Sequence, residues 1–212
     1  MRKKNFLFDF DGTVADSVPW IVKTLNYLAP DFGFQPISDK EYEECRSYTI
    51  HGLIKKFNVP LYKLPFYIVR TRKELTDVIP KMGLCIGIRS VLYKLKKDGM
   101  RLAIVSSSPK AHIEAFLENH KLDVFEFVHS ELNIFGKAAA LNQVIQKYRM
   151  KREETVYAGD EIRDIMACKR AGLDMIAVSW GFNNEKILRK KGAIQIAHKP
   201  LDFLEILQKN YS

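Results

Sequence analysis

The feature that most constrains the fold is the alternation of short apolar runs with amphipathic segments after residue 84. Continuous apolar runs predict buried strands within 100–108, 154–160 and 174–181, and weaker runs predict strands at 125–130 and 193–197. Helical periodicity predicts helices at 88–99, 109–120, 136–148, 161–172, 185–192 and 200–211. Strands that alternate with helices are joined by right-handed crossovers, so the sequence predicts an α/β fold with a mostly parallel, Rossmann-like sheet.

The segment before residue 84 has a different pattern. A first strand is expected at "NFLFDF", residues 5–10, which is apolar and rich in aromatic residues. Residues 17–83 show helical periodicity and no clear strand; Ser38 and Glu41 have the spacing of a capping box, and Pro19 suits a first helical turn. We therefore expect a core of residues 1–16 and 84–212, interrupted by a helical insert of residues 17–83.

The composition is that of an ordinary globular protein. With 212 residues, of which 47% are hydrophobic and 28% charged, the chain can bury one sizeable core. Asp9 and Asp11 interrupt the first apolar run too early for a signal peptide, and no run approaches the roughly 18 apolar residues of a membrane span. Three scattered cysteines form neither a disulfide framework nor a CxxC pair, so we expect a cytoplasmic protein without a membrane partner.

The net charge of +9 permits two interpretations, a nucleic-acid-binding surface or a field that attracts small anions. The basic segments "KLKKDGMR" and "EKILRKKG" have apolar residues interleaved, which is typical of the solvated face of an amphipathic helix. No basic and aromatic nucleic-acid motif accompanies them. We therefore expect no nucleic-acid partner.

Polar and charged residues follow three of the expected strands. In parallel sheets, ligands bind outside the carboxyl ends of the strands, so these residues are expected to meet at one edge. They are Asp9 and Asp11 after the first strand, Ser106 and Ser107 after the second, Asp160 and Asp164 after the strand at 154–160, and Lys137 at a helix start.

The spacing of the four aspartates indicates a cation site. Asp9 and Asp11 are two apart on an extended segment and share a face, with Phe10 pointing into the core. Asp160 and Asp164 are four apart, and we expect them on one helical face, where like charges are unfavourable without a cation. Carboxylates with no His or Cys nearby suit Mg²⁺ better than zinc, and Mg²⁺ completed by substrate oxygens implies a phosphate.

Taken singly, most of these residues have simpler interpretations. Asp160 can cap a helix, Ser106 to Ser108 before Pro109 can form a helix start, and Lys137 can be solvated. The segment "DFDGT" is different, because four of its five positions are specified directly after an apolar strand. The other polar groups support a functional site more strongly because they follow this segment in order along the chain.

In "DFDGTVADS", "IVSSS", "GK" and "GDEIRD", the chain resembles the four ordered motifs of the haloacid dehalogenase-like hydrolases. The segments "DGTVADS" and "SWGF" resemble the phosphoglycolate-phosphatase-like branch, in which a helical cap follows the first strand. The resemblance spans the core, about two-thirds of the chain. The insert matches in position, length and helical character only.

The resemblance implies a role for each site residue. Asp9 would be the nucleophile that forms an aspartyl-phosphate, since an ordinary aspartate is ionised at pH 7 and needs no base. Asp11 would protonate the leaving alkoxide and then activate water. Mg²⁺ would lie between Asp9, the backbone carbonyl of Asp11 and Asp160, with Asp164 supporting the metal. The residues expected to hold phosphate are Ser106, Ser107 and Lys137.

We therefore expect a Mg²⁺-dependent phosphatase acting on a small phosphorylated metabolite, 2-phosphoglycolate being one candidate. The alternatives are a nucleotidase or sugar phosphomutase of the same family, or a non-catalytic basic binding protein. A dehalogenase or phosphonatase is disfavoured, because relatives with those activities lack an aspartate equivalent to Asp11.

The departures from the family pattern bear on the substrate and leave the catalytic groups in place. Ala138 replaces the proline that often follows the lysine, Ser106-Ser107 stands where Thr-Asn is common, and "CIGIRSVL" lacks a Pro-Gly pair. In the insert, the candidates to contact substrate are Arg46, His51, Lys55 and Arg70, each of which is also typical of a solvated residue.

Overall fold

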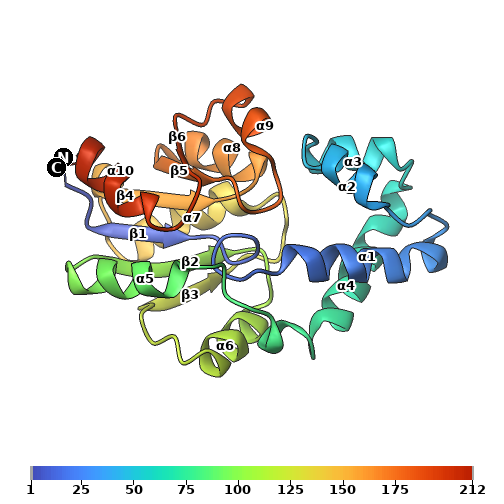
Figure 1. Ribbon diagram of the computed structural model, residues 1–212, viewed down its shortest axis with the longest axis horizontal. Coiled ribbons are helices and arrows are strands. Elements are labelled where there is room, and N and C mark those ends of the chain that lie inside the picture. Colours follow the sequence, from blue (N-terminus) through green and yellow to red (C-terminus); the bar gives the residue numbers. More distant parts are fainter. Residues whose placement is uncertain (1, 212) are drawn as a thin grey trace.

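The computed structural model describes residues 2–211, which form a six-stranded sheet with helices on both faces and a group of helices at one end (Figure 1). All neighbouring strands are parallel, in the order β3-β2-β1-β4-β5-β6. The strands are β1 (Asn5–Phe8), β2 (Arg101–Ser106), β3 (Phe127–Ser130), β4 (Thr155–Gly159), β5 (Asp174–Val178) and β6 (Gln195–Ala197). The predicted α/β fold with a parallel sheet is confirmed.

Strand β1 lies at the centre of the sheet. Later strands are added first on one side of β1 and then on the other. Phe8, the last residue of β1, pairs with Ile104 of β2 on one side and with Ala158 of β4 on the other. The chain builds β2 and β3 on the first side and β4 to β6 on the second. Such a change of side leaves a crevice at the carboxyl ends of the strands, and Asp9 enters it directly from β1.

The helices of the core bury both faces of the sheet. They are α5 (Ile88–Lys97), α6 (Lys110–Asn119), α7 (Lys137–Lys147), α8 (Ile162–Ala171), α9 (Glu185–Lys190) and α10 (Asp202–Tyr211). In β1, Phe6 and Phe8 lie on the face of the sheet that α5 and α10 cover, whereas Leu7 lies on the face that α7 and α8 cover. Because successive residues of a strand point to opposite faces, burial on both sides explains the continuous apolar runs.

Residues 17–83, the helical insert, contain helices and no strand. These are α1 (Val18–Phe32), α2 (Asp39–Cys45), α3 (Ile50–Lys56) and α4 (Leu64–Leu75), with 3-10 turns at Leu61–Lys63 and Ile79–Lys81; a further 3-10 turn, Arg152–Glu154, lies in the core. The capping box of Ser38 and Glu41 is formed as predicted. Ser17 takes the N-cap position of α1 without a capping bond from its side chain.

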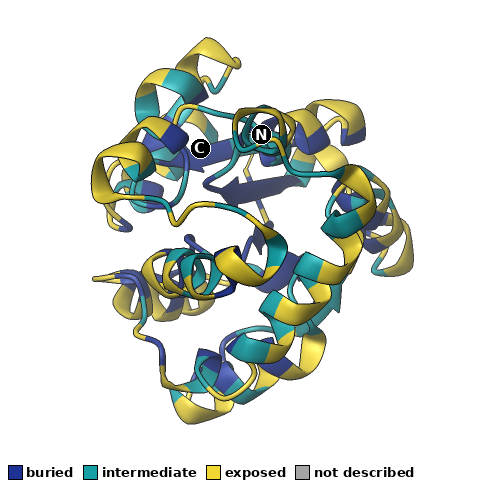
Figure 2. Ribbon diagram, turned by 90° about the vertical axis from the view of Figure 1, so that its right-hand side faces the viewer, coloured by how far each residue is buried: buried dark blue, intermediate teal, exposed yellow. Residues whose placement is uncertain are grey.

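The insert lies beyond the carboxyl ends of the strands (Figure 1). Its helices carry mostly exposed and half-buried residues, and the dark-blue buried residues concentrate in the sheet behind them (Figure 2). The division into a core and a separate cap domain stays a prediction. No helix within residues 2–211 combines the length and apolar character needed to cross a membrane.

Candidate active site

The loop that leaves β1 turns sharply around a glycine. The backbone N–H of Asp9 still donates to the carbonyl of Ala158, 2.8 Å away, as if the strand continued. Gly12 then adopts a φ of +68°, and a Cβ at this position would collide with the carboxylate of Asp160. Residue 12 is therefore glycine for two reasons, a left-handed backbone and the close approach of a buried acid.

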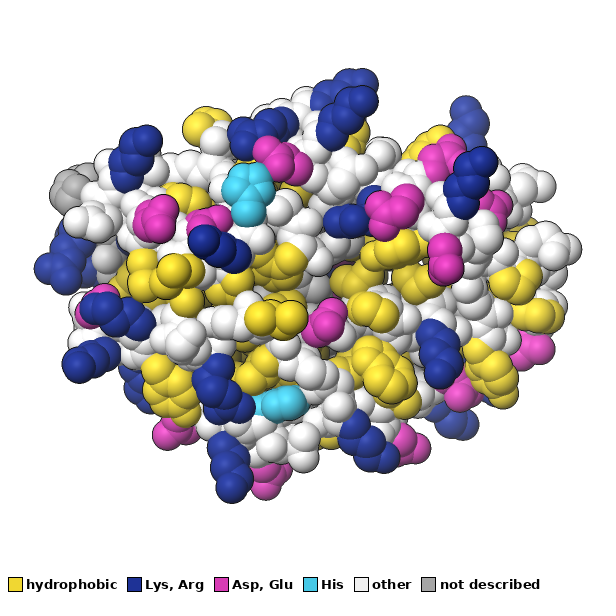
Figure 3. Space-filling view, viewed as in Figure 1, with side chains coloured by type: hydrophobic (Ala, Val, Ile, Leu, Met, Phe, Trp, Pro, Cys, Tyr) yellow, Lys and Arg dark blue, Asp and Glu magenta, His cyan; other side chains and the backbone are white. Residues whose placement is uncertain are grey.

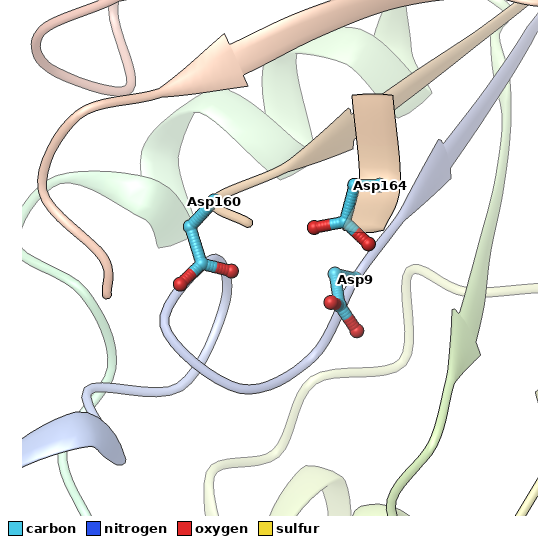
Figure 4. Close-up of side chains that lie close together, drawn as sticks. All are labelled: Asp9, Asp160 and Asp164. Carbon is cyan, nitrogen blue, oxygen red and sulfur yellow. The ribbon is translucent and has the colours of Figure 1, made fainter. Parts of the chain in front are cut away.

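Three aspartates meet at this loop (Figure 4). Asp9 follows β1, Asp160 follows β4, and Asp164 lies in the first turn of α8; each offers a carboxylate oxygen within 4.8 Å of the others. Their exposed fractions are 1%, 1% and 0%, so solvent screens none of the charges. The structure thus brings together three of the four predicted metal ligands by their side chains.

The expectation that Asp160 and Asp164 share a helical face is wrong. Glu161 is the N-cap of α8 and has an extended backbone, with φ −115° and ψ 154°, so Asp160 lies in the loop before the helix. Asp164 accepts a hydrogen bond from the N–H of Glu161 in a capping box. The two acids converge because the loop folds back, and the four-residue spacing is not the cause.

Lys137 is the cation nearest to this cluster. Its Nζ lies 2.5 Å from Asp9 Oδ2 and 2.5 Å from Asp164 Oδ1, and all three side chains are buried. Burial alone would lower the pKa of Lys137, but the carboxylates of Asp164 and Asp9 outweigh burial and raise it above the ordinary value. The lysine is therefore held in its charged form.

One ammonium leaves negative charge in excess, and the excess falls on Asp160. Its carboxylate accepts hydrogen bonds from the N–H of Phe182 and from Thr13 Oγ1, and no lysine or arginine in residues 2–211 pairs with it. Burial, together with the charges of Glu161 and Asp164, raises the pKa of Asp160 well above its ordinary value. Burial likewise raises the pKa of Asp164 to about 6, against the charge of Lys137. A buried set of hard oxygen donors with surplus negative charge fits a divalent cation such as Mg²⁺.

Asp11 lies outside the group of three carboxylates. Ser108 Oγ donates to Asp11 Oδ2, and Asp11 Oδ1 is buried without a hydrogen-bond partner among the described residues. Burial raises the pKa of this carboxyl group, while the hydroxyl groups of Ser108 and Ser17 oppose the shift. A buried acid with one free oxygen is suited to carry a proton; metal binding through its backbone carbonyl stays a prediction.

The predicted phosphate-binding serines lie at the end of β2. Ser106 is buried, and its Oγ accepts a hydrogen bond from the N–H of Ser108 at 3.3 Å. Ser107 Oγ accepts a hydrogen bond from Arg163 Nη1 at 3.0 Å. Ser106 ends β2 and Ser107 begins the loop that also reaches Asp11; the contact of both hydroxyls with phosphate stays a prediction.

Comparison with known proteins identifies the family. A model of the family described as haloacid dehalogenase-like hydrolase matches residues 6–178, which include every one of these site residues. The chain belongs to the haloacid dehalogenase-like hydrolase family. The resemblance inferred from the four motifs is thereby confirmed, and with it the expectation of an enzyme.

Relatives of this hydrolase are similar over nearly their whole length. It is 32% identical over 200 residues to a phosphoglycolate phosphatase of Synechococcus elongatus, with 94% of each chain covered. It is 26% identical over 205 residues to a phosphoglycolate phosphatase of Colwellia psychrerythraea, covering 90% of this chain and 91% of the relative.

Solved structures share the fold at lower identity. A predicted phosphatase from Clostridium acetobutylicum superposes with a TM-score of 0.83 at 22% identity, covering 98% of this chain and 100% of the other. CbbY from Rhodobacter sphaeroides, solved in complex with phosphate, superposes with a TM-score of 0.73 at 17% identity, covering 95% and 96%. At these identities the likeness establishes the fold of the hydrolase.

Three residues that the sequence analysis did not single out lie at the site of this hydrolase. Ser108 is the partner of Asp11, Arg163 is the partner of Ser107, and Arg72 of α4 donates to the backbone carbonyl of Ser107. Ser108 is the last serine of "IVSSS" and Arg163 lies inside "GDEIRD", so the motifs themselves could have identified both residues. Nothing in the sequence around Arg72 sets it apart from other basic residues of the insert.

The four candidates named in the insert have different surroundings. Arg46 donates to the carbonyls of residues 179, 181 and 182, and so joins the insert to the loop beside Asp160. His51 lies 5.1 Å from the ring of Phe135. Lys55 is exposed, and Arg70 pairs with Glu74 on the surface of α4.

A cavity of about 260 Å³ lies between the insert and the core of the hydrolase. Residues 48–51 of the insert line one side, and the beginnings of α7 and α8, including Lys137 and Arg163, line the other. Two of the lining residues, Lys137 and Arg163, are cations that also contact residues of the site.

Proposed function

We propose that this hydrolase is a Mg²⁺-dependent phosphatase that cleaves a small phosphomonoester through an aspartyl-phosphate on Asp9. The observation that carries the proposal is the group of three buried carboxylates, two of which pair with Lys137, with one oxygen of Asp11 lacking a hydrogen-bond partner among the described residues. The relatives named phosphoglycolate phosphatase make 2-phosphoglycolate the first substrate to test.

The nucleophile is held in one orientation. Asp9 Oδ1 accepts from the N–H of Phe10 at 2.8 Å, and Oδ2 accepts from Lys137. A fixed carboxylate loses little freedom on reaching the geometry of in-line attack at phosphorus. Asp9, Asp160 and the backbone carbonyl of Asp11 would hold Mg²⁺, with Asp164 supporting them. The metal would neutralise charge on the phosphate and orient it.

Asp11 transfers the protons. Because burial raises its pKa, Asp11 is protonated more readily than an exposed aspartate, and the protonated form can donate to the leaving alkoxide as the bond to phosphorus breaks. The resulting carboxylate then takes a proton from the water that hydrolyses the aspartyl-phosphate. Ser106, Ser107 and Lys137 would bind phosphate oxygens, adding hydrogen bonds and positive charge where the transition state spreads its negative charge.

The helical insert would act as a cap that closes over the phosphate ester. It lies over the carboxyl ends of the strands and is joined to the core loops through Arg46 and Arg72, with the cavity between them. Closure around a ligand excludes water and lets residues of the insert select the substrate.

The face shown in Figure 3 gives little support to the alternative of a basic binding protein. On the face shown in Figure 3, lysines and arginines are spread out and acidic residues lie among them. A nucleic-acid-binding face would gather basic residues in one patch or stripe. A cytoplasmic location and a small-molecule partner are accordingly part of this proposal.

The proposal is tested by phosphate release from 2-phosphoglycolate. Activity should require added Mg²⁺, disappear with excess chelator and return when Mg²⁺ is restored, with Ca²⁺ a poor substitute because it is larger and less rigidly coordinated. Asp9→Asn should lower kcat by at least about 10³-fold with an unchanged circular dichroism spectrum. Full activity in chelator, or wild-type activity of Asp9→Asn, would exclude this mechanism.

A further inference from the structure

Arg72 of α4 reaches from the insert into the core and keeps donors free. Its Nη2 donates to the carbonyls of Ser107 at 3.0 Å and Leu132 at 2.7 Å. Nη1 and Nε have no partner within residues 2–211, and no carboxylate there pairs with this arginine. A guanidinium carries five N–H donors, so most of those on Arg72 stay available.

The other arginines of the insert that could face the site have no such capacity. Arg46 uses Nε and Nη2 on backbone carbonyls and Nη1 on Glu43. Arg70 pairs with Glu74 at 2.9 Å, and its side chain is 49% exposed. Of these three arginines, Arg72 is therefore the one that contacts the core and still has unpaired N–H donors within the described residues.

Arg163 of α8 approaches the same serine from the core. Its Nη1 donates to Ser107 Oγ at 3.0 Å, and its Nη2 pairs with Glu161 at 2.6 Å. The Nε of Arg163 is buried and lacks a hydrogen-bond partner among the described residues. Ser107 is therefore bound by two arginines, one on its carbonyl and one on its hydroxyl.

These arginines lie beside the segment that contacts Asp11. The neighbour of Ser107 is Ser108, whose hydroxyl donates to Asp11, the proposed proton donor to the leaving oxygen. Burial and the nearby charge of Arg163 lower the pKa of Arg72, and the charge of Asp11 offsets only part of this shift. An anion bound by both arginines would relieve the repulsion between their charges.

We propose that Arg72 and Arg163 form a two-arginine clamp for a carboxylate on the leaving group of the substrate. The proposal rests on the proposed phosphatase function and narrows its substrates to phosphate esters of small hydroxy acids. In 2-phosphoglycolate the carboxylate carbon is two bonds from the leaving oxygen, so an anion site next to the partner of Asp11 is placed to receive it. Guanidinium groups suit carboxylates because their parallel N–H donors match the two oxygens.

The test compares two esters of equal chain length, 2-phosphoglycolate and ethyl phosphate, which has a methyl group in place of the carboxylate. We expect wild-type kcat/KM to favour 2-phosphoglycolate. Arg72→Gln and Arg163→Gln should each lower the ratio of the two kcat/KM values by about 10- to 100-fold, the range for a lost charged hydrogen bond. Arg70→Gln and Arg189→Gln, which remove exposed arginines in ion pairs with Glu74 and Glu185, should leave the ratio unchanged.

The outcomes separate the clamp from the phosphatase. A wild-type ratio near one, an unchanged ratio in Arg72→Gln, or an equal loss for both esters would overturn the clamp and leave the phosphatase standing. An enzyme that hydrolyses neither ester but cleaves 4-nitrophenyl phosphate would overturn the clamp alone, and one that cleaves none of the three would overturn both. Should Arg163→Gln fail to fold, Arg72→Gln still decides, because Arg72 lies in the half-buried layer of the insert.

Discussion

At the scale of single residues, the site depends on small side chains that make room for buried acids. A Cβ on Gly12 would overlap the Asp160 carboxylate, and a Cβ on Gly181 would also overlap Asp160. The acids are recognisable in the sequence because "DFDGT" and "GDEIRD" are local patterns. Arg72 is not recognisable in this way, because a contact between residues 35 positions apart depends on how the insert docks.

Gly12→Ala and Gly33→Ala form a matched pair that tests this arrangement. Both glycines have positive φ, +68° and +79°, but a Cβ on Gly33 would have no atom within 4 Å. Backbone strain should lower the unfolding free energy of each variant by about 1 kcal/mol, measured in urea, and Gly12→Ala should lose more because its Cβ meets the Asp160 carboxylate. Only Gly12→Ala should also raise the Mg²⁺ concentration needed for half-maximal activity. Equal Mg²⁺ requirements in the two variants would contradict the role given to Gly12.

At the scale of elements, one side chain joins the insert to the start of α8. Asn183 Oδ1 accepts from the N–H of Ile162 at 2.8 Å, and Nδ2 donates to the carbonyls of Arg46 at 2.9 Å and Tyr48 at 3.1 Å. The amide is buried, so its loss leaves backbone groups without partners. It therefore ties the position of α2 and α3 to the helix that carries Asp164.

Asn183→Ala should loosen the insert without unfolding the sheet. We expect faster amide hydrogen exchange in residues 39–56 and unchanged exchange in β1 and β4, because local opening can occur independently of the buried strands. Asn142→Ala is the control, since Asn142 bonds Arg152 at an exposed position of the core. Unchanged exchange in residues 39–56 of Asn183→Ala would show that other contacts hold the insert.

At the scale of the whole molecule, the sequence predicts the sheet better than the site's detailed geometry. Continuous apolar strands and helical periodicity are properties of local segments, and the parallel order follows from general rules of connection. The position of Asp160 before α8 was missed because the extended backbone at Glu161 depends on its capping box with Asp164. Docking of the insert through Arg46, Arg72 and Asn183 involves long-range bonds to backbone carbonyls, which leave no pattern in sequence.

The central claim is that Asp9 forms the covalent intermediate and Asp11 directs its breakdown. An aryl phosphate needs no proton on its leaving group, so Asp11→Asn should still be phosphorylated by 4-nitrophenyl phosphate but should hydrolyse the intermediate slowly. Rapid mixing of this variant with 4-nitrophenyl phosphate and Mg²⁺, followed by acid quench and peptide mass spectrometry, tests the claim directly. We predict a burst of nitrophenolate equal to the enzyme concentration, with a phosphate adduct on Asp9. Linear release without a burst or adduct, or an adduct on another residue, would contradict it.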